Sequence, residues 1–290
     1  MPEEFLLSYA SFDAENRSFL EWQVDGKIER GDVMGQELSL AFDVSTKYCT
    51  GWLDFDNHCS QACPDGATVN EKYENCLKCR NRTGFNPAFY HADSVSVQQE
   101  KINQTPHFLY LAYFSPELIK VGISQEARGI RRLLEQGARV ALKLETFASA
   151  LIARQYEAKI ASLNGIMETV AANKKLGLIK QPLNTTVAEQ TLADALMRIH
   201  HQLGLDFPSR TLIMCEDYFH TEGRDLSSVI DMTGNTVLAG TVVSVIGSVL
   251  ITEYDGQLLA YNLKKCIGHR AQTAQGTVDL EIPNTQLTLF

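Results

Sequence analysis

Residues 108–123, FLYLAYFSPELIKVGI, decide the fold of the central part of this chain. Two runs rich in aromatic and branched apolar residues, 108–114 and 118–123, are separated by the short Ser-Pro-Glu segment at 115–117. Such runs favour strands, and a short break of turn-forming residues between them favours an antiparallel hairpin. The sequence therefore predicts a β-hairpin here.

Further periodic segments follow the hairpin. Their apolar spacing predicts helices over 127–136, 149–163 and 187–203. It predicts a strand over 140–146. Gly137 and Gly204 are expected to end the first and last helix, and Thr186 with Glu189 forms a capping box before the last one. Together with the hairpin, these elements predict an α/β domain over residues 107–205.

The chain on both sides of this domain is expected to be β-rich. Residues 1–47 form an N-terminal β segment, and 211–290 a small C-terminal β domain with Asp255-Gly256 as a hairpin turn. The uncharged stretch 233–252, TGNTVLAGTVVSVIGSVLIT, is long enough to span a bilayer. Its Gly, Thr and Val content instead predicts buried strands, so the expected fold class is α+β with no membrane partner.

Composition narrows the function classes. Of the 290 residues, 44% are hydrophobic, which suits a folded core and excludes wholesale disorder. The 26 basic and 35 acidic residues give a net charge of −9, whereas proteins that depend on phosphate contacts are usually basic. A nucleic-acid site must therefore be a local basic patch. Residues 115–160 carry eight basic and five acidic residues, a local balance of +3.

Cysteines gather in a block, residues 48–92, that is followed by a polar connector over 93–106. Cysteines stand at positions 49, 59, 63, 76, 79, 215 and 266. Their number is odd and no secretory hydrophobic stretch follows Met1, which disfavours a disulfide framework. Metal binding in a reducing cytoplasm is the expected role of the clustered cysteines.

The cysteine block has the spacing of a structural zinc site. The candidate ligands are Cys49, Cys59, Cys63, Cys76 and Cys79, with His58 as a weaker candidate. Cys76 and Cys79 form one CxxC knuckle, and two such knuckles hold zinc tetrahedrally. Cys63 completes the second pair with either Cys59 or Cys49, and the spacing leaves this choice open. A redox dithiol at Cys76 and Cys79 is the alternative, but the strand-to-helix setting of such motifs is missing.

The order of elements around the hairpin resembles the GIY-YIG nuclease superfamily. In that family, two adjacent strands carry the motifs, a following helix supplies an arginine, and a later helix supplies a glutamate. The resemblance places Tyr110 on the first motif and Gly122 on the second. Lys120 stands where the second tyrosine usually is. The first motif lacks its leading glycine and the second its tyrosine, which puts activity in question.

The same resemblance implies a set of catalytic residues. The arginine falls on Arg131 or Arg132, and Glu157 matches the glutamate that holds a divalent metal, Mg²⁺ or Mn²⁺. Phosphodiester hydrolysis needs an activated water, a cation near the phosphate and a carboxylate-held metal. Tyr110 or Lys120 would handle the proton, Arg132 would clamp the phosphate, and Glu157 would hold the metal.

A second resemblance covers most of the chain. The motifs that carry it are Cys49–Gly51, Cys63-Pro64, Cys76–Cys79, Tyr110–Ala112, Lys120–Ile123 and Arg132–Ala138. They are similar to a family of bacterial proteins known only as a domain of unknown function. That resemblance implies that Cys49, Cys63, Cys76 and Cys79 are the zinc ligands, and it brings no established activity. Cys59 departs from the family's pattern.

Two functions remain in competition after these observations. The first is a metal-dependent phosphodiesterase on DNA or RNA, with zinc as a structural support. The second is a catalytically inactive zinc-containing module that binds nucleic acid or a protein partner. A redox or metal-handling role for the cysteine block is a third, weaker hypothesis.

Overall fold

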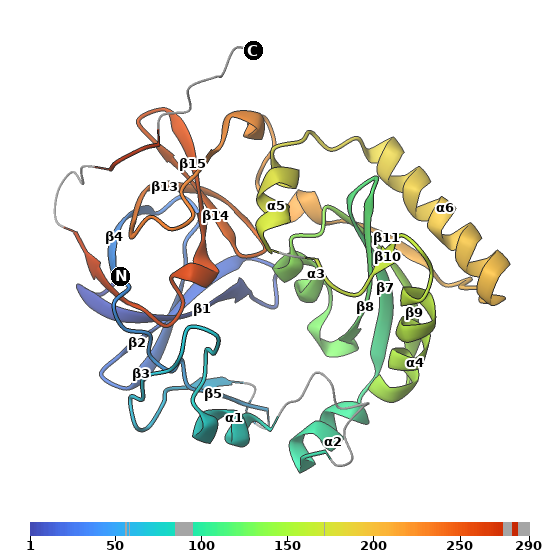
Figure 1. The fold of residues 1–290 in the computed structure, drawn as a ribbon, viewed down its shortest axis with the longest axis horizontal. Coiled ribbons are helices and arrows are strands. Elements are labelled where there is room, and N and C mark those ends of the chain that lie inside the picture. The colour runs from blue at the N-terminus through green and yellow to red at the C-terminus, as the bar shows by residue number, and fades with distance from the viewer. Residues whose placement is uncertain (56, 58, 85–94, 171, 275–279, 284–290) are drawn as a thin grey trace. The chain divides into compact units, whose positions relative to one another are not determined.

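The computed structural model describes residues 1–55, 57, 59–84, 95–170, 172–274 and 280–283 (Figure 1). The chain divides into two compact units. Unit 1 comprises Met1–Asp13, Arg17–Thr83 and His220–Phe290, and unit 2 comprises Ala14–Asn16 and Gly84–Phe219. Both helices and separate sheets are present, which confirms the α+β class.

Unit 1 contains a nine-stranded sheet in the order β12-β15-β14-β13-β4-β16-β1-β2-β3. Its strands are β1 (Glu4–Phe12), β2 (Ser18–Val24), β3 (Lys27–Asp32), β4 (Glu37–Asp43), β12 (Ile230–Asp231), β13 (Val237–Ile246), β14 (Val249–Tyr254), β15 (Gln257–Asn262) and β16 (Arg270–Thr273). Short 3₁₀ turns lie at Leu226–Ser228 and Leu263–Lys265.

This sheet joins two segments that the sequence treats as separate regions. Strand β16 pairs with both β1 and β4, and β13 pairs with β4, so residues 1–47 and the C-terminal segment share one sheet. Local periodicity predicts strands but not their long-range partners, which is why the sequence pattern divides what the sheet unites.

The uncharged stretch 233–252 contributes β13 and the first part of β14, which confirms the predicted strands. Strands β14 and β15 form a hairpin around Asp255 and Gly256, whose φ angles are +48° and +73°. Two consecutive positive φ angles are the geometry of a type I′ turn, for which Asp-Gly is a preferred sequence. Within the described residues, no helix is long and apolar enough to cross a membrane.

The cysteine block of unit 1 is built from short elements. A two-stranded sheet of β5 (Trp52–Asp54) and β6 (Cys59–Gln61) precedes helix α1 (Leu77–Thr83). The buried side chains here are Cys49, Cys63 and Cys79, and few apolar residues pack around them. A segment with so small a core needs additional stabilisation.

Unit 2 is organised around a five-stranded sheet in the order β10-β8-β7-β9-β11 (Figure 1). The strands are β7 (His107–Ser115), β8 (Leu118–Gln125), β9 (Val140–Phe147), β10 (Ile166–Met167) and β11 (Thr211–Met214). The antiparallel pairing of β7 with β8 confirms the predicted hairpin. Strand β11 pairs with β9, so it belongs to this sheet and not to the C-terminal β region where the sequence boundary places it.

Helices cover the sheet of unit 2. They are α2 (Val97–Asn103), α3 (Arg131–Gln136), α4 (Ala150–Ala161), α5 (Ala172–Ile179) and α6 (Thr185–Leu203), with 3₁₀ turns at Glu126–Arg128 and Cys215–Tyr218. On one face of the sheet, Leu109 and Leu111 pack in a core with Ile160 of α4 and Leu192 of α6. The intervening side chains of β7 point to the opposite face, because strand residues alternate.

Two predicted helix starts differ from the structure. The helix predicted over 127–136 begins only at Arg131, because Gly129 has a φ of +53° and separates it from the preceding 3₁₀ turn. The last helix starts at Thr185, and its N-cap is Asn184, whose side chain accepts a hydrogen bond from the Val187 amide. Asparagine competes well with threonine as an N-cap, which shifts the start by two residues.

Candidate functional site

Four cysteine side chains converge in unit 1. The Sγ atoms of Cys49, Cys63, Cys76 and Cys79 all lie within 4.8 Å of one another. Cys49 precedes β5, Cys63 follows β6, and Cys76 and Cys79 flank the start of α1. Sulfurs bound to one zinc ion at about 2.3 Å are about 3.8 Å apart, so this group is positioned for a tetrahedral metal ion and is compatible with structural zinc.

Backbone hydrogen bonds prepare Cys49 to act as a thiolate ligand. The amides of Gly51 and Cys76 donate to its Sγ at 3.4 and 3.1 Å. Gly51 has a φ of +96°, and a Cβ added there would lie 1.9 Å from the carbonyl oxygen of Gln61. Only glycine fits this turn, which explains the Cys-x-Gly sequence at the site.

Burial and hydrogen bonds also shift the pKa values of the Cys49 and Cys76 thiols. Burial raises the pKa of Cys49. Burial acts in the same direction on Cys76, but hydrogen bonds from the backbone and side chain of Cys79 outweigh it and lower the pKa of Cys76 to about 7. A knuckle with a readily formed thiolate suits metal binding.

Cys59 lies outside this group. Its Sγ accepts a hydrogen bond from the side-chain amide of Gln61 at 3.2 Å, on the same short strand. His58, the weaker candidate ligand, lies outside the described residues. The four sulfurs that the structure brings together are the set implied by the family resemblance, and the alternative pair of Cys59 with Cys63 is not assembled.

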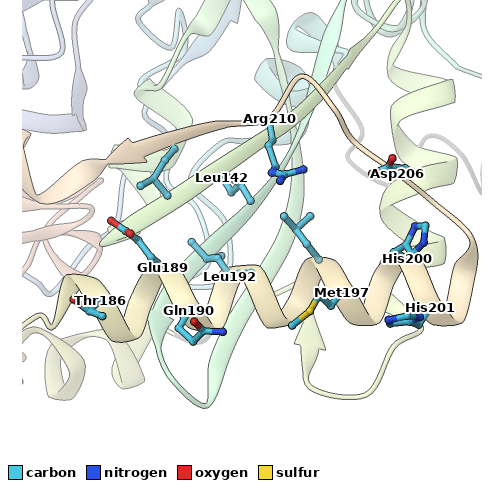
Figure 2. A pocket seen from close by; sticks show the side chains of 13 residues that line it. Leu142, Thr186, Glu189, Gln190, Leu192, Met197, His200, His201, Asp206 and Arg210 are labelled. Carbon is cyan, nitrogen blue, oxygen red and sulfur yellow. The ribbon is translucent and has the colours of Figure 1, made fainter.

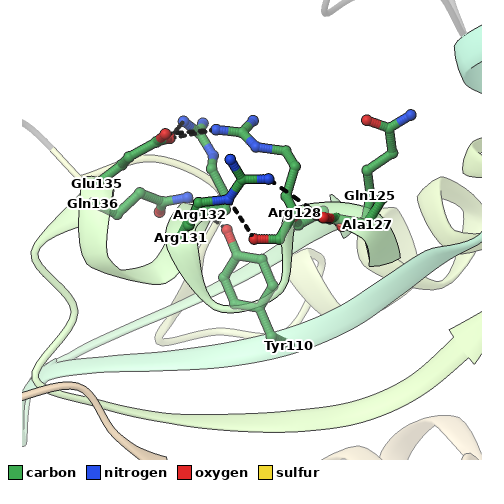
Figure 3. A network of polar contacts seen from close by, with 9 residues as sticks. Tyr110, Gln125, Ala127, Arg128, Arg131, Arg132, Glu135 and Gln136 are labelled. Carbon is green, nitrogen blue, oxygen red and sulfur yellow. Dashed lines mark hydrogen bonds and ion pairs between the residues drawn. The ribbon is translucent and has the colours of Figure 1, made fainter. Parts of the chain in front are cut away.

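The second candidate site is in unit 2, where Tyr110 of β7 lies across Gly122 of β8. The two residues are directly paired, and a Cβ added at Gly122 would lie 2.3 Å from the Tyr110 hydroxyl oxygen. Tyr110 is 1% exposed, and its hydroxyl accepts a hydrogen bond at 2.6 Å from the side-chain amide of Gln136. Figure 3 shows the ring extending from β7 towards α3. Burial raises the pKa of Tyr110 to about 12.

Lys120 lies two pairs along the same hairpin, opposite Ala112. It shares a sheet face with Tyr110, because it is two residues from Gly122, the direct partner of Tyr110. Its Nζ donates to the backbone oxygen of Glu168 at 2.6 Å. Burial lowers the pKa of Lys120 to about 8, against the opposing charge of Glu157. An amine with this pKa is partly neutral near physiological pH.

Glu157 of α4 is a buried carboxylate, at 3% exposed. Burial raises its pKa, while an ion pair with Arg154, one helical turn earlier, opposes that rise. The sequence suggests an ordinary surface pair for these two residues, but the structure buries the acid. Its charge also influences the pKa of both Tyr110 and Lys120.

Arginines of α3 and the preceding turn complete the cluster. Arg128 pairs with Glu135 at 2.6 Å, and Arg132 lies 3.5 Å from the same carboxylate (Figure 3). Arg131 donates instead to the backbone oxygens of Ala127 and Arg128. Of the two predicted arginines, Arg132 is the one whose charge lowers the pKa of both Tyr110 and Lys120.

The four predicted residues come from four elements of unit 2: Tyr110 from β7, Lys120 from β8, Arg132 from α3 and Glu157 from α4. The charges of Arg132 and Glu157 act on the pKa of both Tyr110 and Lys120, and the charge of Lys120 acts on the pKa of Glu157. We call this set the polar cluster. Its chemistry combines a partly neutral amine, a buried carboxylate and an arginine whose side chain is 43% exposed. Such a set can bind a phosphate and move a proton.

Sequence reasoning did not assign a role to three supporting residues. Gln136 positions the Tyr110 hydroxyl, Arg154 pairs with Glu157, and Lys175 of α5 donates to the backbone oxygen of Gln136. The i,i+3 spacing of Arg154 and Glu157 was visible in the sequence. The contacts of Gln136 and Lys175 join segments distant in sequence, so no local pattern could have found them.

A hollow of about 620 Å³ lies elsewhere in unit 2, between α6 and the strands β9 and β11. Leu142 lies on the strand side, and His200 and His201 lie towards the end of α6 (Figure 2). Leu212 of β11 also lines the hollow. Both histidines are exposed. None of the polar cluster lines this hollow.

Comparison with known proteins identifies a family without assigning an activity. The family described as "Protein of unknown function (DUF2797)" matches residues 35–271. No curated protein and no solved structure matches the chain. The matched range contains both the four clustered cysteines and the polar cluster.

Proposed function

We propose that this chain, which belongs to the DUF2797 family, is a zinc-containing phosphodiesterase that acts on nucleic acid. The observation that carries the proposal is the polar cluster: Tyr110 and Lys120 share one face of the β7–β8 hairpin, and the charges of Arg132 and of the buried Glu157 act on the pKa of both. These are the positions at which the chain resembles GIY-YIG nucleases. The positive local charge around them suits a phosphate ligand.

Zinc is proposed as the ion held by Cys49, Cys63, Cys76 and Cys79. Four sulfur ligands form the set that structural zinc prefers, and they leave no open position for a substrate. Its contribution is folding free energy for a segment with few apolar contacts. The zinc site therefore supports the fold, and the chemistry is assigned to unit 2.

Each residue of the polar cluster has a role in phosphodiester hydrolysis. Arg132 binds the scissile phosphate and offsets charge that develops on its oxygens. Lys120 in its neutral form accepts the proton of the attacking water, because its lowered pKa gives an amine near neutral pH. Tyr110 stays protonated at a pKa of about 12 and orients groups through its hydroxyl.

Glu157 would hold a divalent cation together with the substrate phosphate. Among the described residues, the cysteines form the one group of three or more metal-ligating side chains. A single carboxylate nevertheless suits Mg²⁺ or Mn²⁺, which keep waters and bind substrate phosphate oxygens. The cation would neutralise phosphate charge. Binding of the cation would weaken the ion pair between Arg154 and Glu157.

One observation favours a second candidate function, a binding module without catalysis. The carboxylate of Glu157 is buried and already paired with Arg154, so its negative charge is satisfied without a metal. Lys120 and Arg132 would then bind phosphate and leave the phosphodiester bond intact. This candidate predicts salt-dependent nucleic-acid binding and no cleavage.

The experiment that separates these candidates measures cleavage of labelled single- and double-stranded DNA and RNA with Mg²⁺ or Mn²⁺. The phosphodiesterase proposal expects cleavage by the wild-type chain and its loss in Glu157→Gln, with zinc content unchanged. Glu189→Gln, an exposed glutamate on α6, is the matched control and should keep full activity. Binding with a steep salt dependence and no cleavage of any substrate would support the binding module instead.

A further inference from the structure

The surface of the cysteine block carries three contacts between cations and aromatic rings. The guanidinium carbon of Arg80 lies 4.4 Å from the centroid of the Tyr73 ring, and that of Arg82 lies 5.6 Å from Trp52. The Nζ atom of Lys72 is also 5.6 Å from the Tyr73 ring. These five residues, from β5, α1 and the loop before α1, are called the stacking surface below (Figure 1 places β5 and α1).

No acid among the described residues neutralises the cations of the stacking surface. Within the described part of the chain, Lys72, Arg80 and Arg82 form no ion pair with a carboxylate. Lys78, on the same short helix as the two arginines, is different, because its Nζ lies 2.8 Å from both carboxylate oxygens of Asp65. Three cations therefore remain available to an anionic ligand while a fourth, close by, is already paired.

The cations and the Tyr73 ring are open to solvent, and Trp52 is partly exposed. Tyr73 is 38% exposed, and Lys72, Arg80 and Arg82 are all exposed. Leu77 on the outer side of α1 is 65% exposed, whereas Cys79 on the inner side is fully buried. Arg80 and Arg82 are two positions apart on the helix, or about 200°, so they lie on its two flanks on either side of the Leu77 ridge.

The four clustered cysteines hold β5 and α1, the elements that carry the stacking surface, in place. Cys76 and Cys79 anchor α1, and Trp52 packs against the buried cysteines. Without these contacts, the cysteine block has few apolar side chains whose burial could offset the conformational entropy lost on folding. Because the rings are held before any ligand arrives, binding would cost less conformational entropy than ordering a flexible loop.

From these observations we infer that the stacking surface binds single-stranded nucleic acid. Unpaired bases expose π faces that stack on aromatic rings and on guanidinium planes, and phosphates accept hydrogen bonds from the edges of arginine. A duplex hides its base faces, so the rings favour single strands. An acidic protein partner would use the cations without needing the rings. This inference concerns unit 1 and does not depend on the phosphodiesterase proposal.

The test uses the full zinc-loaded chain and a labelled oligothymidylate, followed by fluorescence anisotropy over a range of salt concentrations. The double variant Arg80→Gln/Arg82→Gln should bind at least about tenfold more weakly. Each phosphate contact on a single strand contributes about 0.7 to the slope of log affinity against log salt concentration. Loss of two contacts in the double variant should therefore reduce the magnitude of this slope by roughly 1.4. Lys78→Gln removes one charge from the same helix and should bind within about twofold of wild type.

A second variant separates stacking from simple charge attraction. Tyr73→Leu removes a ring but no charge, so affinity should fall at least about fivefold while the salt slope stays the same. Tryptophan fluorescence gives a local signal, because Trp22 is 8% exposed and Trp52 is the other of the two tryptophans. Quenching by the oligonucleotide should persist in Arg132→Gln and diminish in Arg80→Gln/Arg82→Gln. Zinc content and circular dichroism verify that each variant folds.

Several outcomes would overturn the inference. Equal loss of affinity in Lys78→Gln and the double variant would mean general electrostatic attraction. An unaffected Tyr73→Leu would remove stacking, and duplex DNA bound as tightly as the single strand would remove the preference. Failure of the phosphodiesterase proposal would give a different result. Either the wild type would not cleave, or Glu157→Gln would cleave as well as the wild type. Neither result depends on whether the oligonucleotide quenches Trp52 fluorescence.

Discussion

The cysteine group of unit 1 and the polar cluster of unit 2 are assembled in opposite ways. Cys49, Cys63, Cys76 and Cys79 lie within 31 residues of sequence, on short elements with few apolar neighbours. The polar cluster instead rests on a five-stranded sheet with its own apolar core. A metal can therefore order the first region, whereas the second is ordered by packing and carries buried polar groups at a cost.

The comparison teaches which changes should affect folding and which should affect chemistry. Glu157 and Lys120 have pKa values shifted mainly by burial, so the fold holds them in a setting unfavourable to their charged forms. Groups held in this way are typical of functional sites. Disturbing the cysteine group should cost stability first, and disturbing the polar cluster should cost activity first.

The largest effect is expected from loss of the metal. Cys79→Ser removes a fully buried ligand, and the chain should lose its zinc and on the order of 10 kcal/mol of metal-coupled folding free energy in the cysteine block. Metal analysis and limited proteolysis of residues 49–83 measure both changes. Cys59→Ser is the matched control and should keep zinc. A chain that keeps zinc without Cys79 but loses it without Cys59 would contradict the assigned ligand set.

The next effect concerns catalysis by Lys120. Lys120→Met should lower the cleavage rate by about 10²- to 10⁴-fold with little change in stability, because it removes the proposed general base. In the wild type, the neutral base gains population as pH rises through about 8, so the rate should increase with pH and level off above that value. Lys265→Met, at an exposed lysine of unit 1, should keep both rate and profile. A pH–rate profile that is flat between about 6 and 10, roughly two units on either side of the Lys120 pKa, argues against this base.

A smaller effect is expected from crowding at the hairpin. Gly122→Ala places a methyl group 2.3 Å from the hydroxyl oxygen of the buried Tyr110, so the ring must shift, and the change should destabilise unit 2 by about 1–3 kcal/mol. Gly177→Ala, on α5 with no atom within 4 Å of the added Cβ, should instead stabilise by about 0.5–1 kcal/mol. Urea denaturation of the two variants gives the comparison. Equal midpoints would mean that Tyr110 does not lie across Gly122.

The smallest effect is expected from the Tyr110 hydroxyl itself. Tyr110→Phe keeps the buried ring but removes the acceptor of the Gln136 amide, which should destabilise the chain by about 1 kcal/mol. Because burial raises the pKa of Tyr110 to about 12, and raises that of Tyr113 and Tyr261 as well, ultraviolet titration should show a late-ionising component that Tyr110→Phe reduces. Tyr73→Phe, on the exposed surface, should alter neither stability nor this late titration. Loss of stability well above 3 kcal/mol would indicate a role beyond this hydrogen bond.

Much of unit 2 was predictable because its information is local. The hairpin of β7 and β8, the strand β9 and the last helix all follow from periodicity and turn residues. The predicted helix starts were less reliable. Asn184 and not Thr186 caps the last helix, and the positive φ at Gly129 separates the 3₁₀ turn at Glu126–Arg128 from the helix that begins at Arg131. The placement of β11 in the central sheet came from pairing with β9, which local pattern does not encode.

The sequence by itself determined the candidate chemistry: clustered cysteines at knuckle spacing, and a lysine, arginines and a glutamate at positions that resemble a nuclease family. Spacing along the chain carries this information because ligands on one loop or knuckle stay close whatever the rest of the fold does. The resemblance also indicated which cysteines belong together.

Tertiary structure decided what no local pattern could. It excluded Cys59 from the sulfur group, gave Arg131 and Arg132 different contacts, buried Glu157 against Arg154, and joined residues 4–43 and 230–273 in one sheet. The physical reason is the same in each case. Burial, electrostatic coupling and strand pairing depend on distances between residues far apart in sequence, and only the folded chain fixes those distances.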